Sequence, residues 1–212
     1  MLLNLVRKDF ILVKKYVLFM AALCLLLPLF LLSRLPEFAG PLTYFISVVY
    51  SIFLLLQYVF LKEYQAPKAS LLLCSSPYPR RLVVLGKYAF CLIIYIVCTL
   101  LYLLESLFLP GLGKFHATMA VLVFSIVTVF CGIYLPLQYR LGFEKTKFVT
   151  TIIIMACPFL APFVLSKAEM FERFIQPLSP SLFYGMLLSV SFLMLIVSAC
   201  LSVYFYEHTD LA

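Results

Sequence analysis

The chain has 212 residues, of which 65% are hydrophobic and 12% are charged, and its mean hydropathy is +1.13. Soluble domains carry about 25% charged and about 45–50% apolar residues, so this composition excludes a water-soluble enzyme, a soluble nucleic-acid binder and a disordered regulator. The net charge of +7 is better explained by membrane orientation than by a nucleic-acid partner. A membrane helix needs about 20 residues, so the length accommodates six spans with short loops and no sizeable soluble domain.

The first 15 residues are predicted to form an amphipathic helix. Apolar residues recur there at helical spacing, namely Leu2, Val6, Phe10, Val13 and Val17. The basic residues lie largely off this stripe, namely Arg7, Lys8, Lys14 and Lys15. We expect residues 1–15 to lie on the inner membrane surface and to lead into the first span. A simple basic anchor is the alternative, and the two interpretations are compatible.

Six apolar stretches of 17 to 25 residues are predicted to span the membrane. They cover residues 16–32, 41–61, 88–109, 117–137, 148–165 and 182–206. Pro158 and Pro162 interrupt the fifth stretch, which predicts a kink or an early helix end there. The sequence therefore predicts an all-α polytopic membrane protein whose residues 1–212 form a single transmembrane domain.

The basic residues predict the orientation of these spans. With the N-terminus in the cytoplasm, twelve of the sixteen lysines and arginines fall on the inner side, in the N-terminal segment and in the loops after the second and fourth spans. The four that fall outside are Arg34, Lys114, Lys167 and Arg173. This asymmetry predicts that both termini are cytoplasmic. It also leaves no separate basic patch, so nucleic acid is not an expected partner.

The sequence carries none of the patterns that an intramembrane enzyme needs. There is no G-x-S-x-G, no H-E-x-x-H and no nucleotide-binding glycine-rich loop, and the seven cysteines include no C-x-x-C pair. We expect no catalytic residue, no metal site and no cofactor bound by this chain. Glu105 is the one acid inside a predicted span, where a charge is by default a functional hypothesis. Because it lies near the outer end of its span, we expect its side chain to reach the outer interface instead.

Two inner segments carry the most information. The longest loop, residues 62–87, runs from a polar start at Glu63 through the apolar residues 71–74 to a break at Ser76 and Pro77. A short apolar stretch outside the membrane is costly unless something covers it, so we expect it to contact a partner or the lipid. The loop after the fourth span mixes aromatic and charged residues around Gly142, which permits a tight turn. The alternative for this second segment is an ordinary basic loop.

The order of these parts resembles the small permease subunits of the type-2 ABC exporter superfamily. The closest resemblance is to the compact six-span subgroup found mainly in Gram-positive bacteria, which includes exporters of amphipathic peptide toxins. The resemblance is carried by Leu5-Val6-Arg7-Lys8-Asp9-Phe10, by Glu63 with Leu71-Leu72-Leu73, Ser76-Pro77, Arg80-Arg81 and Gly86-Lys87-Tyr88, and by Leu135-Pro136-Leu137, Gly142-Phe143 and Glu144-Lys145. Members often have a leucine where this chain has Ser76.

The resemblance implies a half-transporter in the bacterial cell membrane that has no ATPase of its own. It implies two copies of a separate ABC ATPase subunit, which hold ATP and Mg, and a second permease, identical or a sister chain. Loop 62–87 would carry the coupling helix, and the loop after the fourth span would be a smaller contact. The implied ATPase-coupling residues are Glu63, Leu71, Leu72, Leu73, Ser76, Pro77, Arg80, Arg81, Tyr139, Gly142, Phe143, Glu144 and Lys145.

A transport path needs polar groups at membrane depth. The second span places four of them on one helical face, namely Thr43, Ser47, Tyr50 and Gln57. The alternative is hydrogen bonding between helices, which such residues commonly provide in membranes. By resemblance the cargo is amphipathic or hydrophobic, such as a peptide toxin, an antimicrobial peptide, a lipid-like compound or a drug. A cofactor-exporter permease and a membrane scaffold or assembly factor without transport are the alternatives that the sequence leaves open.

Overall fold

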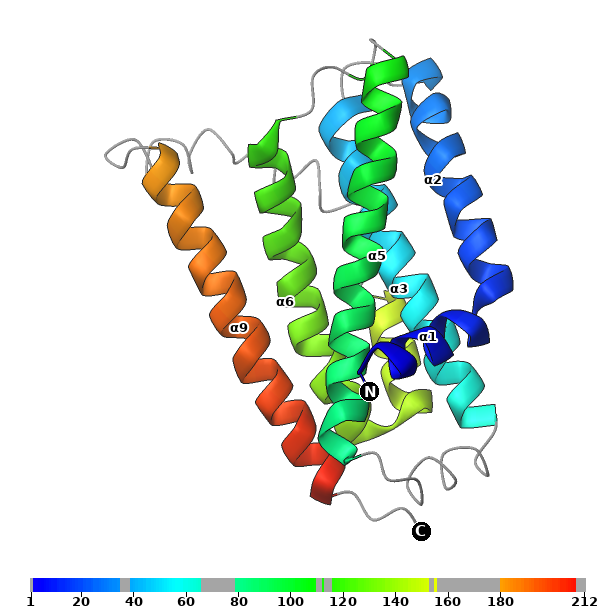
Figure 1. Ribbon diagram of the computed structural model, residues 1–212. Coiled ribbons are helices and arrows are strands. Elements are labelled where there is room, and N and C mark those ends of the chain that lie inside the picture. Colours follow the sequence, from blue (N-terminus) through cyan, green and yellow to red (C-terminus); the bar gives the residue numbers. More distant parts are fainter. Residues whose placement is uncertain are drawn as a thin grey trace.

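The computed structural model describes residues 2–34, 39–65, 79–109, 112, 116–152, 155 and 180–208. Its helices are α1 (Leu2–Leu12), α2 (Lys14–Arg34), α3 (Ala39–Gln65), α5 (Arg80–Phe108), α6 (Ala117–Leu141) and α9 (Pro180–His208). Residues 143–152 are also helical. The described part of the chain contains no strand and is all α (Figure 1).

Five of these helices are long and apolar enough to cross a membrane. The candidate spans are Lys14–Ser33, Leu42–Gln65, Arg81–Phe108, Ala117–Leu141 and Leu182–His208. They correspond to five of the six predicted stretches, so the prediction of an all-α polytopic membrane protein is confirmed. The remaining stretch, residues 148–165, lies mostly outside the described residues, although its first residues, 148–152, are helical.

The helices extend beyond the apolar stretches that predicted them. α3 continues to Gln65 and α5 begins at Arg80, so the predicted loop 62–87 is too long at both ends. Residues 66–78, the middle of that loop, lie outside the described residues. α6 continues through Pro136 and ends before Gly142, which has a φ of 80°. Hydropathy detects only the apolar middle of a helix, whereas charged residues near its ends continue the same backbone hydrogen bonds.

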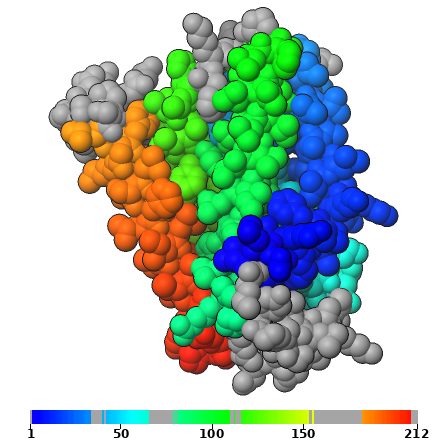
Figure 2. Space-filling view, in the orientation of Figure 1, coloured from blue at the N-terminus to red at the C-terminus, as the bar shows by residue number. Residues whose placement is uncertain are grey.

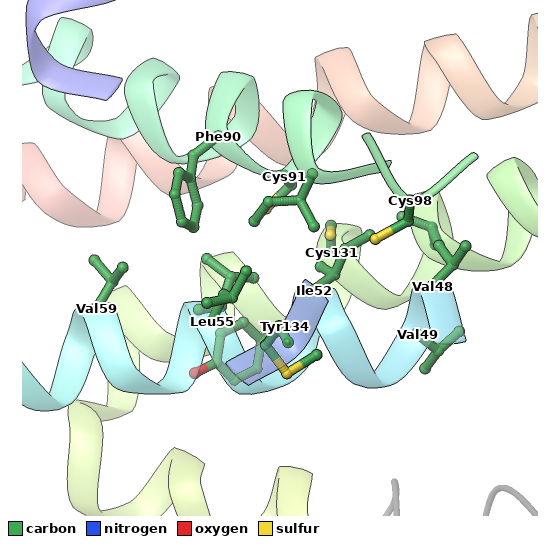
Figure 3. Close-up of a cluster of buried hydrophobic side chains, with 14 of the residues drawn as sticks. Val48, Val49, Ile52, Leu55, Val59, Phe90, Cys91, Cys98, Cys131 and Tyr134 are labelled. Carbon is green, nitrogen blue, oxygen red and sulfur yellow. The ribbon is translucent and has the colours of Figure 1, made fainter. Parts of the chain in front are cut away.

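α3 is the most buried of the five long helices, and α2 and α9 are the least buried. One face of α3 is fully buried along its length, at Tyr44, Val48, Ile52, Leu56 and Val59. Side chains from α5 and α6 close around this helix, as Figure 3 shows for Phe90, Cys91, Cys98, Cys131 and Tyr134. The core therefore lies between α3, α5 and α6, and large parts of α2 and α9 present apolar side chains to the outside.

α6 and α9 form the most extensive helix pair and run in the same direction. Three contacts along the pair join residues that are 66 or 67 positions apart, namely Ser125 with Ser191, Ser198 with Gly132, and Tyr139 with Tyr206. A constant offset is the signature of parallel helices. α3 is also parallel to α6, because Phe53 contacts Phe130 and Tyr64 contacts Phe143. We call the end of the bundle where α3, α6 and α9 end and α5 begins the lower end, at the bottom of Figure 1.

α1 is a separate short helix that lies across the bundle near the lower end, on its surface (Figures 1 and 2). A turn at Val13 separates it from α2. Val6 and Val13 of the predicted stripe are buried, and the other members, Leu2, Phe10 and Val17, pack against the core. The apolar stripe therefore faces the protein's own helices. The position of this segment at a membrane surface stays a prediction.

Candidate functional site

Four charged side chains from three helices form a closed ring at the lower end. Lys8 and Asp9 belong to α1, Glu63 to α3 and Lys87 to α5. Lys87 Nζ lies 3.0 Å from Asp9 Oδ1 and 2.7 Å from Glu63 Oε1. Lys8 Nζ lies 3.3 Å from the same Asp9 oxygen and 2.9 Å from the same Glu63 oxygen. Each carboxylate oxygen is thus shared by two ammonium groups, and we call this set of four residues the ionic ring.

The ionic ring carries no net charge and is largely withdrawn from solvent. The side chains of Lys87 and Asp9 are 1% and 3% exposed, and those of Lys8 and Glu63 are 32% and 29% exposed. Burial of the Lys8 ammonium favours its neutral form, but attraction by Glu63 and Asp9 outweighs burial and holds the pKa of Lys8 above its usual value. Buried charges persist only when they are paired and hydrogen-bonded, and this ring meets that condition.

Local packing explains why these charges meet. Asp9 lies one helical turn after Leu5 on α1, so it shares the buried face of that helix. Gly86 lets α1 approach α5 closely, because a Cβ at this position would lie 3.4 Å from the Leu5 Cβ. The Phe10 and Phe90 rings lie 4.7 Å apart on the two helices. α1 is therefore fixed to α5 by apolar contacts as well as by charge.

A second set of contacts ties the segment after α6 to the same end. The Tyr64 hydroxyl at the end of α3 donates a 2.8 Å hydrogen bond to Glu144 Oε1. The Tyr64 and Phe143 rings stack with their centroids 5.5 Å apart. Arg140 lies 5.6 Å from the Phe205 ring. These contacts join α3, α6 and α9 next to the ionic ring.

The structure brings part of the predicted coupling set together. Glu63 lies in the ionic ring, Arg81 pairs with Glu207 at 3.0 Å, and Phe143 is buried. Tyr139 packs between Phe60 and Tyr206, with ring centroids 6.0 and 5.2 Å away. Glu144 and Lys145 are exposed, and Gly142 makes the turn after α6. Arg80 opens α5, and nothing is described of its side chain, while Leu71, Leu72, Leu73, Ser76 and Pro77 lie outside the described residues.

The basic residues predicted for the N-terminal helix divide into two groups. Arg7, Lys14 and Lys15 are exposed, whereas Lys8 turns into the ionic ring. Sequence reasoning missed Asp9 and Lys87 as members of a site. The available signal was the position of each charge on an apolar face, Asp9 beside Leu5 and Val13, and Lys87 between Val84 and Cys91. A charge on such a face requires a partner of opposite sign.

Two of the four residues of the predicted polar stripe of α3 lie inside the bundle, and the other two are partly exposed. Thr43 and Ser47 are buried, and their hydroxyl oxygens have no hydrogen-bond partner among the residues that the structure describes. Tyr50 and Gln57 are half-buried. A neighbouring residue of the same helix, Tyr44, contacts Thr99 at 2.8 Å. The role of the stripe in a transport path stays a prediction.

Glu105 does not reach the outer interface as expected. It is only 8% exposed, and its Oε1 has no hydrogen-bond partner in the described ranges. Cys98, Tyr102 and Glu105 follow one another at helical spacing on the buried face of α5. This face is anchored to α3, because the Tyr102 hydroxyl donates a 2.8 Å hydrogen bond to the Gly40 carbonyl. Glu105 is therefore buried because it lies on the face of α5 that packs inward, although a carboxylate prefers water.

Among the residues that the structure describes, no group of three or more His, Cys, Asp or Glu side chains is placed to hold a metal ion. The five cysteines described there are free thiols, four of them buried. In the comparisons with known proteins, the family model described as "ABC-2 family transporter protein" matches residues 4–207. No curated protein and no solved structure matches the chain.

Proposed function

Because the chain belongs to the ABC-2 family of transporter proteins, we propose that it is the permease subunit of an ATP-driven exporter. The matched region, residues 4–207, is a membrane permease domain and not an ATPase. ABC-2 permeases generally work with an ABC ATPase. In our proposal a separate ATPase, in two copies, holds ATP and Mg and docks at the lower end of the bundle.

The observation that carries this proposal is the attachment of the segment between α3 and α5 at both of its ends. Glu63 lies just before residues 66–78 and Lys87 follows soon after them, and the two side chains meet in the ionic ring. A docking segment transmits a push only if its ends are rigidly joined to the spans. The ring, together with the Tyr64–Glu144 contact, supplies such a joint between α1, α3, α5 and the segment after α6.

The direction of the helices supports six spans with the lower end in the cytoplasm. Two parallel spans are separated by an odd number of further crossings, so parallel α6 and α9 require one more crossing between them. Residues 143–152 begin at the lower end, since Phe143 contacts Tyr64. Of the ten described basic residues outside the ring, nine belong to the lower end, namely Arg7, Lys14, Lys15, Lys62, Arg80, Arg81, Arg140, Lys145 and Lys147, and only Arg34 lies at the opposite end, where α2 ends. This charge excess fits a cytoplasmic face and cytoplasmic termini.

The proposed transport unit is a pair of permeases, either two copies or this chain with a sister chain. Exposed apolar residues on α2 and α9, such as Phe19, Phe30 and Leu193, would face lipid or the second permease. ATP-driven closure of the two ATPase subunits would push on the segment 66–78 and on Tyr139–Lys145 and so tilt the helices. We propose amphipathic or hydrophobic molecules, with amphipathic peptides first, as the cargo.

The experiment is affinity purification of the tagged chain from its native membranes, followed by identification of any ATP-binding subunit that comes with it. We expect Leu72→Glu with Leu73→Glu to abolish that co-purification. The control variant, Thr209→Glu with Leu211→Glu, adds the same two charges to the C-terminal tail and should retain the ATPase. Full retention by the Leu72/Leu73 variant would refute docking through this segment, and absence of any ATPase from the wild-type sample would refute the proposed function.

A further inference from the structure

We propose that the ionic ring makes α1, the end of α3 and the start of α5 one rigid unit, with Asp9 and Lys87 as its positioning residues. The inference rests on the proposed function only for the origin of the movement. Whatever displaces the docking segment would then displace α1 with it. The N-terminal helix would be a moving part of the transport machinery rather than a passive anchor.

The positions of the four residues along the chain support this unit. Glu63 stands two residues before the end of α3, and Lys87 stands seven residues after the start of α5. At about 1.5 Å of rise per residue, both lie within about 11 Å of the helix ends that flank the intervening segment. Because straight helix joins each of them to that segment, the 2.7 Å contact between Glu63 and Lys87 fixes the spacing of its two ends.

The closed pattern of contacts makes the ring hold α1 more firmly than a single ion pair would. Removing Asp9 leaves two lysines for one carboxylate, and removing Lys87 leaves two carboxylates for one lysine. Either change leaves an uncompensated charge at a position that is 1–3% exposed in the native chain. Lys87 also lies 5.3 Å from the Phe60 ring, so the unit includes the last turns of α3.

A cysteine pair reports directly on the contact between α1 and α5. A Cβ at position 86 would lie 3.4 Å from the Leu5 Cβ, close to the separation of about 3.5–4.5 Å that a disulfide requires. We therefore expect Leu5→Cys with Gly86→Cys to form a disulfide readily under mild oxidation, and we call this bond the α1–α5 cross-link. Each single variant is the control for reactions with the native cysteines.

The first arm uses the full chain alone in native membranes, so it does not depend on an ATPase. Asp9→Asn and Lys87→Gln should slow formation of the α1–α5 cross-link at least about tenfold, because each leaves a buried charge unpaired. Asn4→Lys changes the net charge of α1 by the same amount as Asp9→Asn, but at an exposed position, and should leave the rate unchanged. An unchanged rate in Asp9→Asn and Lys87→Gln would overturn the proposal that the ring holds α1.

The second arm uses the complex with its co-purified ATPase. In the complex trapped with ATP and vanadate, the α1–α5 cross-link should form at a rate within about twofold of the rate without nucleotide, because α1 and α5 move together. A tenfold lower rate in the trapped complex would overturn the rigid unit. Asp9→Asn should lower kcat for ATP hydrolysis about threefold at unchanged KM for ATP, since the segment ends lose their spacing. When Asp9→Asn is combined with Leu5→Cys and Gly86→Cys, oxidation to the α1–α5 cross-link should restore kcat. Reduction of the disulfide should lower kcat again.

The two arms separate the failure of this proposal from the failure of the proposed function. If no ATPase accompanies the chain, the proposed function fails, and the first arm still decides whether the ring holds α1. If an ATPase accompanies the chain but kcat is not restored by the cross-link, the proposed function stands and the positioning role is overturned. A ring that only stabilises the fold would leave kcat of the assembled complex unchanged.

Discussion

At the lower end, the four charged side chains of the ionic ring join α1, α3 and α5. In contrast, serines, small residues and contacts between aromatic rings join α6 and α9. In the ionic ring, each lysine Nζ lies 2.7 to 3.3 Å from the carboxylate oxygens that it contacts. Along α6 and α9, Ser191 donates to Ser125 at 3.0 Å, and Ser198 donates to the Gly132 carbonyl at 2.9 Å. The first junction is short and ionic, and the second is long and only weakly polar.

This difference matches the place of each junction along the bundle. A ring of charges is tolerated near the end of a bundle, where Lys8 and Glu63 keep a third of their side chains exposed. Helices at membrane depth associate through close packing and hydroxyl hydrogen bonds, each worth about 0.6 kcal/mol on average. A junction of many weak contacts tolerates small shifts, whereas an ionic ring is either closed or broken. The lower end is therefore suited to transmitting a displacement.

The largest predicted effect is the loss of Lys87. Lys87→Met should lower the free energy of unfolding by about 3 kcal/mol, because it leaves Asp9 and Glu63 with one lysine between them. The measurement is denaturant-induced unfolding of the purified chain in bicelles. Lys147→Met removes an exposed lysine from the same end and should change the stability by less than about 0.5 kcal/mol. Equal effects of the two substitutions would contradict the special status of the ring.

A smaller effect is expected at the end of the bundle opposite the lower end, where two backbone segments approach each other closely. A Cβ at Gly40 would lie 2.7 Å from the Leu112 carbonyl oxygen, so Gly40→Ala should cost about 1–2 kcal/mol. Gly185 lies in α9 with no atom within 4 Å of the added Cβ, so Gly185→Ala should be neutral or slightly stabilising. Melting temperatures in detergent compare the two, and the prediction is wrong if Gly40→Ala melts no earlier than Gly185→Ala.

The α6–α9 junction should respond only weakly to the loss of one hydroxyl. Ser198 contacts the Tyr88 hydroxyl at 2.6 Å in addition to the Gly132 carbonyl. Ser198→Ala should still cost only about 0.6 kcal/mol, as is typical for such bonds in membranes. Ser189→Ala, which removes an exposed hydroxyl bonded within its own helix, is the control. A cost above that of Lys87→Met would reverse the comparison between the two junctions.

The smallest effect is expected for the ion pair between Arg81 and Glu207. Their side chains are 72% and 35% exposed, so solvent screens the 3.0 Å contact. Arg81→Met should cost at most about 0.5 kcal/mol, and the cost should vanish in high salt. Unfolding at low and high ionic strength tests this, and a salt-independent loss would show that Arg81 acts through packing. The same salt series should leave the larger effect of Lys87→Met mostly intact, because that charge is buried.

Much of the fold follows from hydropathy, whereas the ionic ring does not. The five described spans match apolar stretches because lipid and core both require apolar side chains along about 20 residues. The predicted apolar stretches end at Leu61 and begin again at Tyr88, so hydropathy alone places Glu63 and Lys87 in a loop. Both lie in helices, because charged residues near a helix end continue its backbone hydrogen bonds, and their pairing offsets the cost of burial.

The candidate site was only partly predictable for the same reason. Glu63 was expected to act in coupling by resemblance, but its partners on α1 and α5 depend on which helices become neighbours. Periodicity along one helix carries no information about a partner helix. The burial of Asp9, of Glu105 and of Thr43 likewise follows from which face of each helix packs inward. Asp9 could have been flagged as a charge on an apolar stripe, although nothing in the sequence names its partners.

The most direct test of coupling at the lower end is photocross-linking in intact cells. A photoreactive amino acid at position 72 should yield an adduct with an ATP-binding subunit, identified by mass spectrometry. The same amino acid at position 182, at the start of the candidate span Leu182–His208 and at the opposite end of the bundle, should yield no such adduct. An ATPase adduct at position 72 alone is the predicted result. Its absence, or equal adducts at both positions, would contradict ATPase docking at the lower end.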